Sequence, residues 1–189
     1  MSLSNDAKKS LVRLYRLCFK NSISSNEYSA LPCFNFNFIR GSRILFVSQN
    51  PGNPFTLQEI NRFEKMSMLN FRDYQKEFNE SWSNSLFGKF YQKVCSYVSK
   101  DCLEESSFTN LIKRPTIKNK TPILSNLDLD CFKKELEIIS PKLIVFLSKF
   151  AHDNSGDLIN RPVLVFKHPA TMKYADNYAK EIANKICLI

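Results

Sequence analysis

Three apolar runs of the sequence lead into polar side chains of the kind that bind ligands or hold water. These side chains are Asn50, Asn110 and His168. A side-chain amide carries one acceptor and two donors, and it is too weak a base to take a proton at neutral pH. An imidazole titrates near neutral pH and still donates a hydrogen bond when it is neutral. Together these groups are of the polar, turn-forming type that occurs in catalytic sites.

The apolar runs themselves predict four buried strands, because each is short, contains β-branched residues and stops at a turn-forming or polar group. Helical periodicity between them favours a parallel sheet covered on both faces. We therefore predict an α/β fold: a three-layer α/β/α arrangement around a four-stranded, mainly parallel sheet. The strands are predicted at 43–48, 107–112, 142–147 and 162–167, and the helices at 4–20, 56–65, 86–99, from Asp128 or Asp130 to about 139, and 174–186.

The predicted sheet decides where a site would lie. Ligands of such sheets bind beyond the carboxyl ends of the strands, so Asn50, Asn110 and His168 are expected to meet at one edge. The remaining strand ends in Ser148 and Lys149, which are less informative.

Length and composition set further bounds. With 189 residues, 43% of them hydrophobic, the chain is predicted to form a single domain over 1–189, with an N-terminal helix and loop over 1–39 and a core over 40–187. No run approaches eighteen apolar residues and no signal peptide is visible, so we expect a cytoplasmic monomer with no membrane contact, nucleoid-associated or, in a eukaryote, nuclear. The net charge of +9 suits a polyanionic partner such as DNA.

Cysteine and histidine usage gives no metal-site pattern. The six cysteines include no C-x-x-C pair, and only two histidines accompany them. We therefore expect reduced, mostly buried thiols, no metal and no cofactor.

Four segments, taken in order, resemble the motifs of the uracil-DNA glycosylase superfamily over about 40–187. Ser48-Gln-Asn-Pro-Gly52 is similar to the Gly-x-Asn-Pro-Gly motif of the mismatch-specific and single-strand-selective branches. Ser107-Phe-Thr-Asn-Leu-Ile-Lys-Arg-Pro115 is similar to the Thr-Asn-x-x-Lys-x-Arg-Pro segment of the thermostable branch, and 131–151 resembles the helix and strand that follow it there. Lys167-His-Pro-Ala170 resembles the closing His-Pro-Ser motif.

The resemblance implies a DNA glycosylase that flips out uracil or a related damaged base and hydrolyses its N-glycosidic bond in base excision repair. Two residues would be catalytic: Asn50 would orient the attacking water, and His168 would donate a hydrogen bond to the base oxygen as negative charge develops. Asn110 would pair with the donor-acceptor edge of uracil, and Phe87, in Leu86-Phe87-Gly88, would stack on the extruded base. The other residues implied to bind the substrate are Gln49, Pro51 and Gly52.

Basic residues near two of these motifs suggest where DNA would bind. No acidic residue occurs between 106 and 127, so phosphate contacts are expected there, although a solvated basic loop is the alternative. The loop 170–174 corresponds to the family's loop that enters the duplex, with Met172 as an apolar wedge. The residues predicted to contact DNA are Lys113, Arg114, Lys118, Lys120, Met172 and Lys173.

Three departures from the family pattern have consequences. Ser48 stands where the first motif begins with Gly, and Gly52 stands where the most uracil-strict branch has a Tyr that blocks the thymine methyl. The thermostable branch holds an iron–sulfur cluster on four cysteines, of which only the Cys131 position is filled. A single thiolate cannot hold a four-ligand cluster, so no iron–sulfur cluster is expected.

Other interpretations remain open from the sequence. The segment 50–52 could be only a tight turn, Asn110 could cap or bridge loops, and Phe87 could be a core residue. The alternative function is a catalytically degenerate glycosylase-fold protein that binds DNA or a modified base, and Ser48 is the residue that favours it. A small-nucleotide hydrolase is a third possibility, but no Gly-rich phosphate loop supports it.

Overall fold

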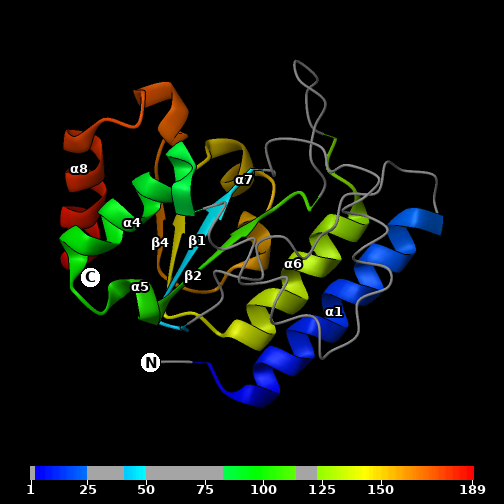
Figure 1. Ribbon diagram of the computed structural model, residues 1–189. Helices are drawn as coiled ribbons and strands as arrows, with labels where there is room; N and C mark the ends of the chain where they lie inside the picture. The colour runs from blue at the N-terminus through cyan, green and yellow to red at the C-terminus, as the bar shows by residue number, and fades with distance from the viewer. Residues whose placement is uncertain (1–2, 25–40, 50–82, 114–122) are drawn as a thin grey trace.

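A four-stranded parallel sheet forms the centre of the computed structural model, which describes residues 3–24, 41–49, 83–113 and 123–189 (Figure 1). The strand order is β2-β1-β3-β4, and every neighbouring pair is parallel. All four carboxyl ends therefore lie at one edge, as predicted. The strands are β1 (Ile44–Ser48), β2 (Ser106–Asn110), β3 (Leu143–Phe146) and β4 (Val163–Val165).

Helices cover both faces of the sheet, which confirms the predicted three-layer α/β/α fold. Figure 1 shows α1 and α6 on one side of the strands and α4 and α8 on the other. The short helices occupy the two edges of the sheet, with α5 at the amino edge and η3 at the carboxyl edge. The helices are α1 (Asn5–Ser24), α4 (Leu86–Val98), α5 (Cys102–Glu105), α6 (Asn126–Ile139), α7 (Lys149–Asp153), η2 (Gly156–Leu158), η3 (Pro169–Met172) and α8 (Asp176–Cys187).

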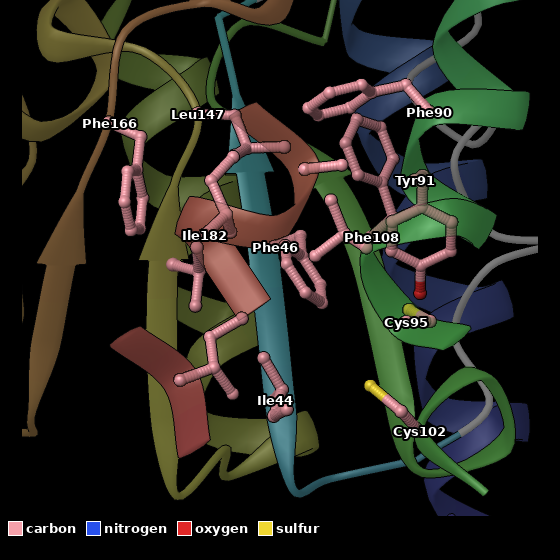
Figure 2. Packing of buried hydrophobic residues seen from close by; sticks show 14 of the residues in the cluster. Ile44, Phe46, Phe90, Tyr91, Cys95, Cys102, Phe108, Leu147, Phe166 and Ile182 are labelled. Atoms are coloured by element: carbon pink, nitrogen blue, oxygen red, sulfur yellow. The ribbon is translucent and has the colours of Figure 1, made fainter. Parts of the chain in front are cut away.

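Side-chain alternation along the strands separates the core into two parts. Phe46 and Phe108 point toward α4 and α8, where the edge of the Tyr91 ring meets the Phe46 ring at a centroid distance of 5.1 Å (Figure 2). Val47, the next residue of β1, packs instead against the core beneath α1 and α6. All residues of β1, β2 and β3 are buried, which explains the apolar runs of β1 and β3. β2 is buried although four of its five residues are polar.

The start of α6 differs from the prediction. Neither Asp128 nor Asp130 is the N-cap; Ser125 is, and its hydroxyl accepts from the backbone N–H of Asp128 at 3.3 Å. The Asp128 carboxylate in turn accepts from the Ser125 backbone N–H at 3.0 Å. Asp128 is thus the third residue of the helix and the acidic half of a capping box.

The last helix begins two residues later than predicted, at Asp176. Lys173 and Tyr174 adopt left-handed backbone conformations, with φ of 51° and 54°, and they break the helical path. The helix predicted at 56–65 lies outside the described residues, and the single-domain division into 1–39 and 40–187 stays a prediction. None of the helices in the described ranges is long and apolar enough to cross a bilayer.

Candidate functional site: the carboxyl edge of the sheet

The ends of β1 and β2 place two polar residues side by side. Ser48 and Asn110 are paired in the sheet register, and both are buried. They share their strand face with Phe46 and Phe108, because residues two apart point the same way. The amide of Asn110 is therefore on the α4 side of the sheet, at its carboxyl edge.

The Phe87 ring connects this corner to the segment that follows β4. Its centroid lies 5.1 Å from that of Phe108 and 5.8 Å from that of His168, with an angle of 35° between the Phe87 and His168 ring planes. β2 and β4 are the outer strands of the sheet, about 14 Å apart at a spacing of about 4.8 Å per strand. A half-buried aromatic ring from α4 thus contacts both Phe108, on the same strand as Asn110, and the imidazole of His168.

Local capping fixes where Phe87 lies. Ser85 is the N-cap of α4, and its hydroxyl accepts from the Gly88 backbone N–H at 3.0 Å. Because Phe87 lies in the first turn, its ring extends past the end of the helix toward the carboxyl edge of the sheet. The Tyr174 ring meets it edge-on, at a centroid distance of 6.5 Å.

The hydrogen bonding of His168 indicates the tautomer of its ring. The Nδ1 atom accepts from the Ala170 backbone N–H at 3.2 Å, so in the neutral ring the proton is on Nε2. Burial lowers the pKa of His168 below its ordinary value of 6.5, which favours this neutral form at pH 7. The structure therefore presents a neutral imidazole with an Nε2–H donor.

The loop after His168 is compact and strained. Thr171 donates to the His168 carbonyl from both its backbone N–H, at 2.9 Å, and its hydroxyl, at 2.7 Å. The 3-10 helix η3 follows, and then the two left-handed residues Lys173 and Tyr174. Met172 and Lys173 are exposed on this loop, with Met172 at 38% exposure. The loop thus holds an apolar side chain in solvent, and the role of Met172 as a wedge stays a prediction.

Lys113 is not on the basic surface predicted from the sequence. Its side chain is 3% exposed, and its ammonium pairs with the Glu135 carboxylate of α6, which is fully buried. The same ammonium donates to the Thr109 hydroxyl at 2.7 Å and to the Asn110 carbonyl at 2.5 Å. An ammonium held this way faces the core beneath α6 instead of solvent, so the predicted phosphate contact does not fit this geometry.

Several predicted residues lie outside the described ranges: Asn50, Pro51, Gly52, Arg114, Lys118 and Lys120. The chain can be followed as far as Gln49, which is half-buried and whose carbonyl accepts from the Ile112 backbone N–H at 2.8 Å. The Ser48 carbonyl accepts in the same way from Leu111 at 2.9 Å. β1–β2 bonding therefore continues past the strands to the residue before Asn50.

Two residues of this region had no predicted role. Glu135 has a recognisable signal, since it stands on the buried stripe of α6 together with Cys131, Phe132, Leu136 and Ile139. A carboxylate on such a stripe requires a buried partner. Tyr174 has no comparable signal, because its place depends on left-handed backbone that neither glycine nor asparagine marks.

The cysteines do not form a metal centre in the described ranges. Cys131 belongs to the core beneath α1 and α6, whereas Cys95 and Cys102 belong to the core on the opposite face of the sheet. All three are free thiols, and the hydrogen bond with Cys95, together with burial, raises the pKa of Cys102 well above its ordinary value. Among the residues that the structure describes, no three His, Cys, Asp or Glu side chains could hold a metal ion.

The fold defines a class: three-layer α/β/α proteins with a parallel central sheet, in which ligands generally bind beyond the carboxyl ends of the strands. Within that class, residues 36–186 match the model of the Uracil DNA glycosylase superfamily, and the chain belongs to this family. A search of curated proteins finds no match. Family membership supports a glycosylase-type function and an association with DNA.

Proposed function

We propose that this chain is a monofunctional DNA glycosylase that extrudes uracil, or a related damaged base, and hydrolyses its N-glycosidic bond. The reaction breaks the bond between C1′ and the base nitrogen, and the electron pair leaves with the base. Water supplies the hydroxyl that bonds to C1′, and its proton ends on the released base. The demands on the protein are a site for the extruded ring, a donor for the developing negative charge and an oriented water.

One observation carries the proposal: the Phe87 ring lies against both Phe108 and His168. This contact brings together an aromatic platform and an Nε2–H donor from distant parts of the chain. A pyrimidine stacked on Phe87 would direct one edge toward the amide of Asn110, two residues beyond Phe108 on the same strand face. Its oxygen would accept from His168.

The neutral state of His168 suits this role. A neutral imidazole costs less to desolvate than an imidazolium and still donates to the leaving base, and the bond from Ala170 fixes the ring orientation. Asn50, which follows the last described residue of this edge, would orient the attacking water. Gln49, Pro51 and Gly52 would complete the base pocket.

DNA would approach along the same edge. Met172 and Lys173, both exposed on the loop after His168, would enter the duplex and meet phosphate. Arg114, Lys118 and Lys120 would contribute further phosphate contacts. We propose that the protein acts as a monomer without metal or cofactor, in the compartment that holds the DNA.

The test is base release from oligonucleotides with one uracil, either single-stranded or opposite a mismatched guanine, compared with thymine-containing strands of the same sequence. Alkali cleavage of the products reports abasic sites. We expect cleavage of the uracil strand, and cleavage about 10²–10³-fold slower by His168→Ala after the same purification. A contaminating host enzyme would instead give equal rates in the two preparations.

Absence of product from both uracil substrates would refute the proposal. In that event, tight and salt-sensitive binding to the same strands would identify a DNA-binding protein that has lost catalysis.

A further inference from the structure

A buried lysine lies directly behind the strand end that carries Asn110. The Lys113 ammonium bonds the Asn110 carbonyl at 2.5 Å, the Thr109 hydroxyl at 2.7 Å and the Glu135 carboxylate. The Thr109 hydroxyl donates in turn to the two Glu135 oxygens, at 3.0 and 3.1 Å. Three groups around one ammonium thus tie the last peptide of β2 to α6.

The other end of the same turn is also tied to α6. The Lys113 backbone N–H donates to the Asp128 carboxylate at 2.9 Å, and that carboxylate is itself held by the Ser125 capping box. Between these two attachments, Leu111 and Ile112 bond back to the end of β1. The turn 110–113 is therefore fixed at both ends and in the middle.

Net stability does not account for this arrangement. A buried ion pair gains little over well-packed apolar residues, because the attraction of the two charges barely offsets their desolvation. Its specific effect is geometric: a charged donor fixes a carbonyl more rigidly than a neutral one does. Here the fixed carbonyl belongs to Asn110, whose side chain lies on the opposite, α4 side of the sheet.

We propose that Lys113, with Glu135, is a positioning residue for base recognition: it holds the Asn110 peptide from behind so that the Asn110 amide meets the base in one orientation. The inference rests on the proposed function for its substrate, and it replaces the predicted phosphate contact by Lys113. Lys113 touches neither base nor DNA in this role.

The decisive variant removes both charges together. Lys113→Met alone would leave the Glu135 carboxylate buried without its cation, whereas Lys113→Met/Glu135→Met leaves an apolar pair of similar volume. We expect this double variant to fold, to bind uracil-containing single strands within about twofold of wild type at every salt concentration, and to lose about 100-fold in kcat, the scale of a misplaced binding group.

Amide hydrogen exchange measured by NMR gives a second readout that does not depend on activity. In the double variant, exchange at Leu111 and Ile112 should rise at least about tenfold relative to wild type, since the turn is no longer held. Exchange at Leu147, which bonds to Val47 in the adjacent strand pair, should not change.

Thr109→Val provides a milder variant that keeps both charges and the fold. It removes one ligand of the ammonium, and its kcat and turn exchange should lie between those of wild type and the double variant. Wild-type kcat and exchange in either variant would overturn the inference. A fall in DNA affinity with a salt slope reduced by about one would also overturn it, because that result identifies a phosphate contact.

The two proposals fail in different ways. If the wild-type protein releases no base, the proposed function is wrong, and the exchange data still decide whether Lys113 holds the turn. If the wild-type protein releases uracil and the double variant does so equally fast, only the positioning role is wrong.

Discussion

The two faces of the sheet differ at its carboxyl edge. On the α6 side, Thr109, Lys113 and Glu135 form a closed network in which the charged groups are buried and paired. On the α4 side, Phe87 and His168 meet at a half-buried aromatic contact next to an exposed loop. On the α6 side, which we call the closed side, the polar groups are paired with one another. The α4 side, which we call the open side, presents the face of an aromatic ring and a hydrogen-bond donor.

The end of β2 belongs to both sides. Thr109 points into the closed network and Asn110 points toward the aromatic side, because neighbouring residues of a strand face opposite ways. A rigid support and a recognition group can therefore be built from two consecutive residues. The comparison shows that the buried charged groups that make the end of β2 rigid lie on the face of the sheet that no ligand has to enter.

The largest effect should come from breaking the closed side. Lys113→Met alone leaves the fully buried Glu135 carboxylate without its cation, and the free energy of unfolding should fall by about 3–5 kcal/mol. The double variant with Glu135→Met should recover most of that loss. Urea unfolding of the two variants measures the difference.

An exposed ion pair gives the matched control for this prediction. Lys149 and Asp153 pair at 2.6 Å on α7, where the Lys149 side chain is 78% exposed. Lys149→Met should change the free energy of unfolding by less than about 1 kcal/mol. Equal effects of Lys149→Met and Lys113→Met would mean that burial of the network has no energetic consequence.

The next largest effect should come from the donor on the open side. His168→Ala should lower kcat for uracil release by about 10²–10³, the usual result of losing one donor to developing negative charge. Binding of the uracil strand should stay close to wild type, as a gel-shift titration would show.

The second histidine is the natural control. His152 lies at the end of α7 against the Phe146 ring, on the other face of the sheet. His152→Ala should keep the wild-type kcat. A parallel loss in both histidine variants would point to damaged folding instead of a missing donor.

A smaller effect is expected from the aromatic platform. Phe87→Leu keeps an apolar contact with Phe108 but removes the stacking face, so binding of a uracil-containing single strand should weaken by about 1–3 kcal/mol. Phe90, three residues along α4 and fully packed, is the matched position. Phe90→Leu should lower the free energy of unfolding and leave uracil binding unchanged. If Phe90→Leu weakens uracil binding and Phe87→Leu does not, Phe87 is not the stacking ring.

Most of the strands and helices could be predicted from the spacing of apolar residues in the sequence, and the features that could not have physical causes. Strands buried on both faces give continuous apolar runs, so β1 and β3 were predictable within a residue or two. The candidate site depended on the rule that ligands bind beyond strand ends. Asn110 and His168 lie at the carboxyl ends of parallel strands, Asn50 lies outside the described residues, and the roles of all three stay predictions. The role of Lys113 was not visible in a local stretch of basic residues, because the burial of its side chain depends on Glu135 of α6, 22 residues along the chain.

The sequence did indicate that Glu135 needs a buried partner. Glu135 interrupts the apolar stripe of α6, and a carboxylate there requires a cation from the facing element. Which cation it is depends on the register between β2 and α6, which no local pattern encodes. Likewise, the left-handed backbone of Tyr174 goes with the packing of its ring against Phe87 and Phe90, which the residue's own preferences do not predict.

The smallest expected effect is a pH dependence that belongs to the open side alone. Burial lowers the pKa of His168 below 6.5, so the unfolded chain binds a proton there more readily than the folded chain does. The stability from the neutral ring is therefore complete above pH 6.5 and is lost as the pH falls through the lowered pKa. Protonation of Nδ1 would also remove the acceptor of the Ala170 N–H.

His168→Gln should remove this dependence, which urea unfolding at pH 7 and pH 5 can measure in both proteins. The carboxylates of Glu105, Asp153 and Asp176 add little slope over this range, because their ordinary pKa values already lie below 5 and hydrogen bonds and ion pairs lower them further. A wild-type protein that is as stable at pH 5 as at pH 7 would show that the imidazole is solvated. His168 would then be an imidazolium at mildly acid pH. The open side would differ from the closed side only in how exposed its polar groups are.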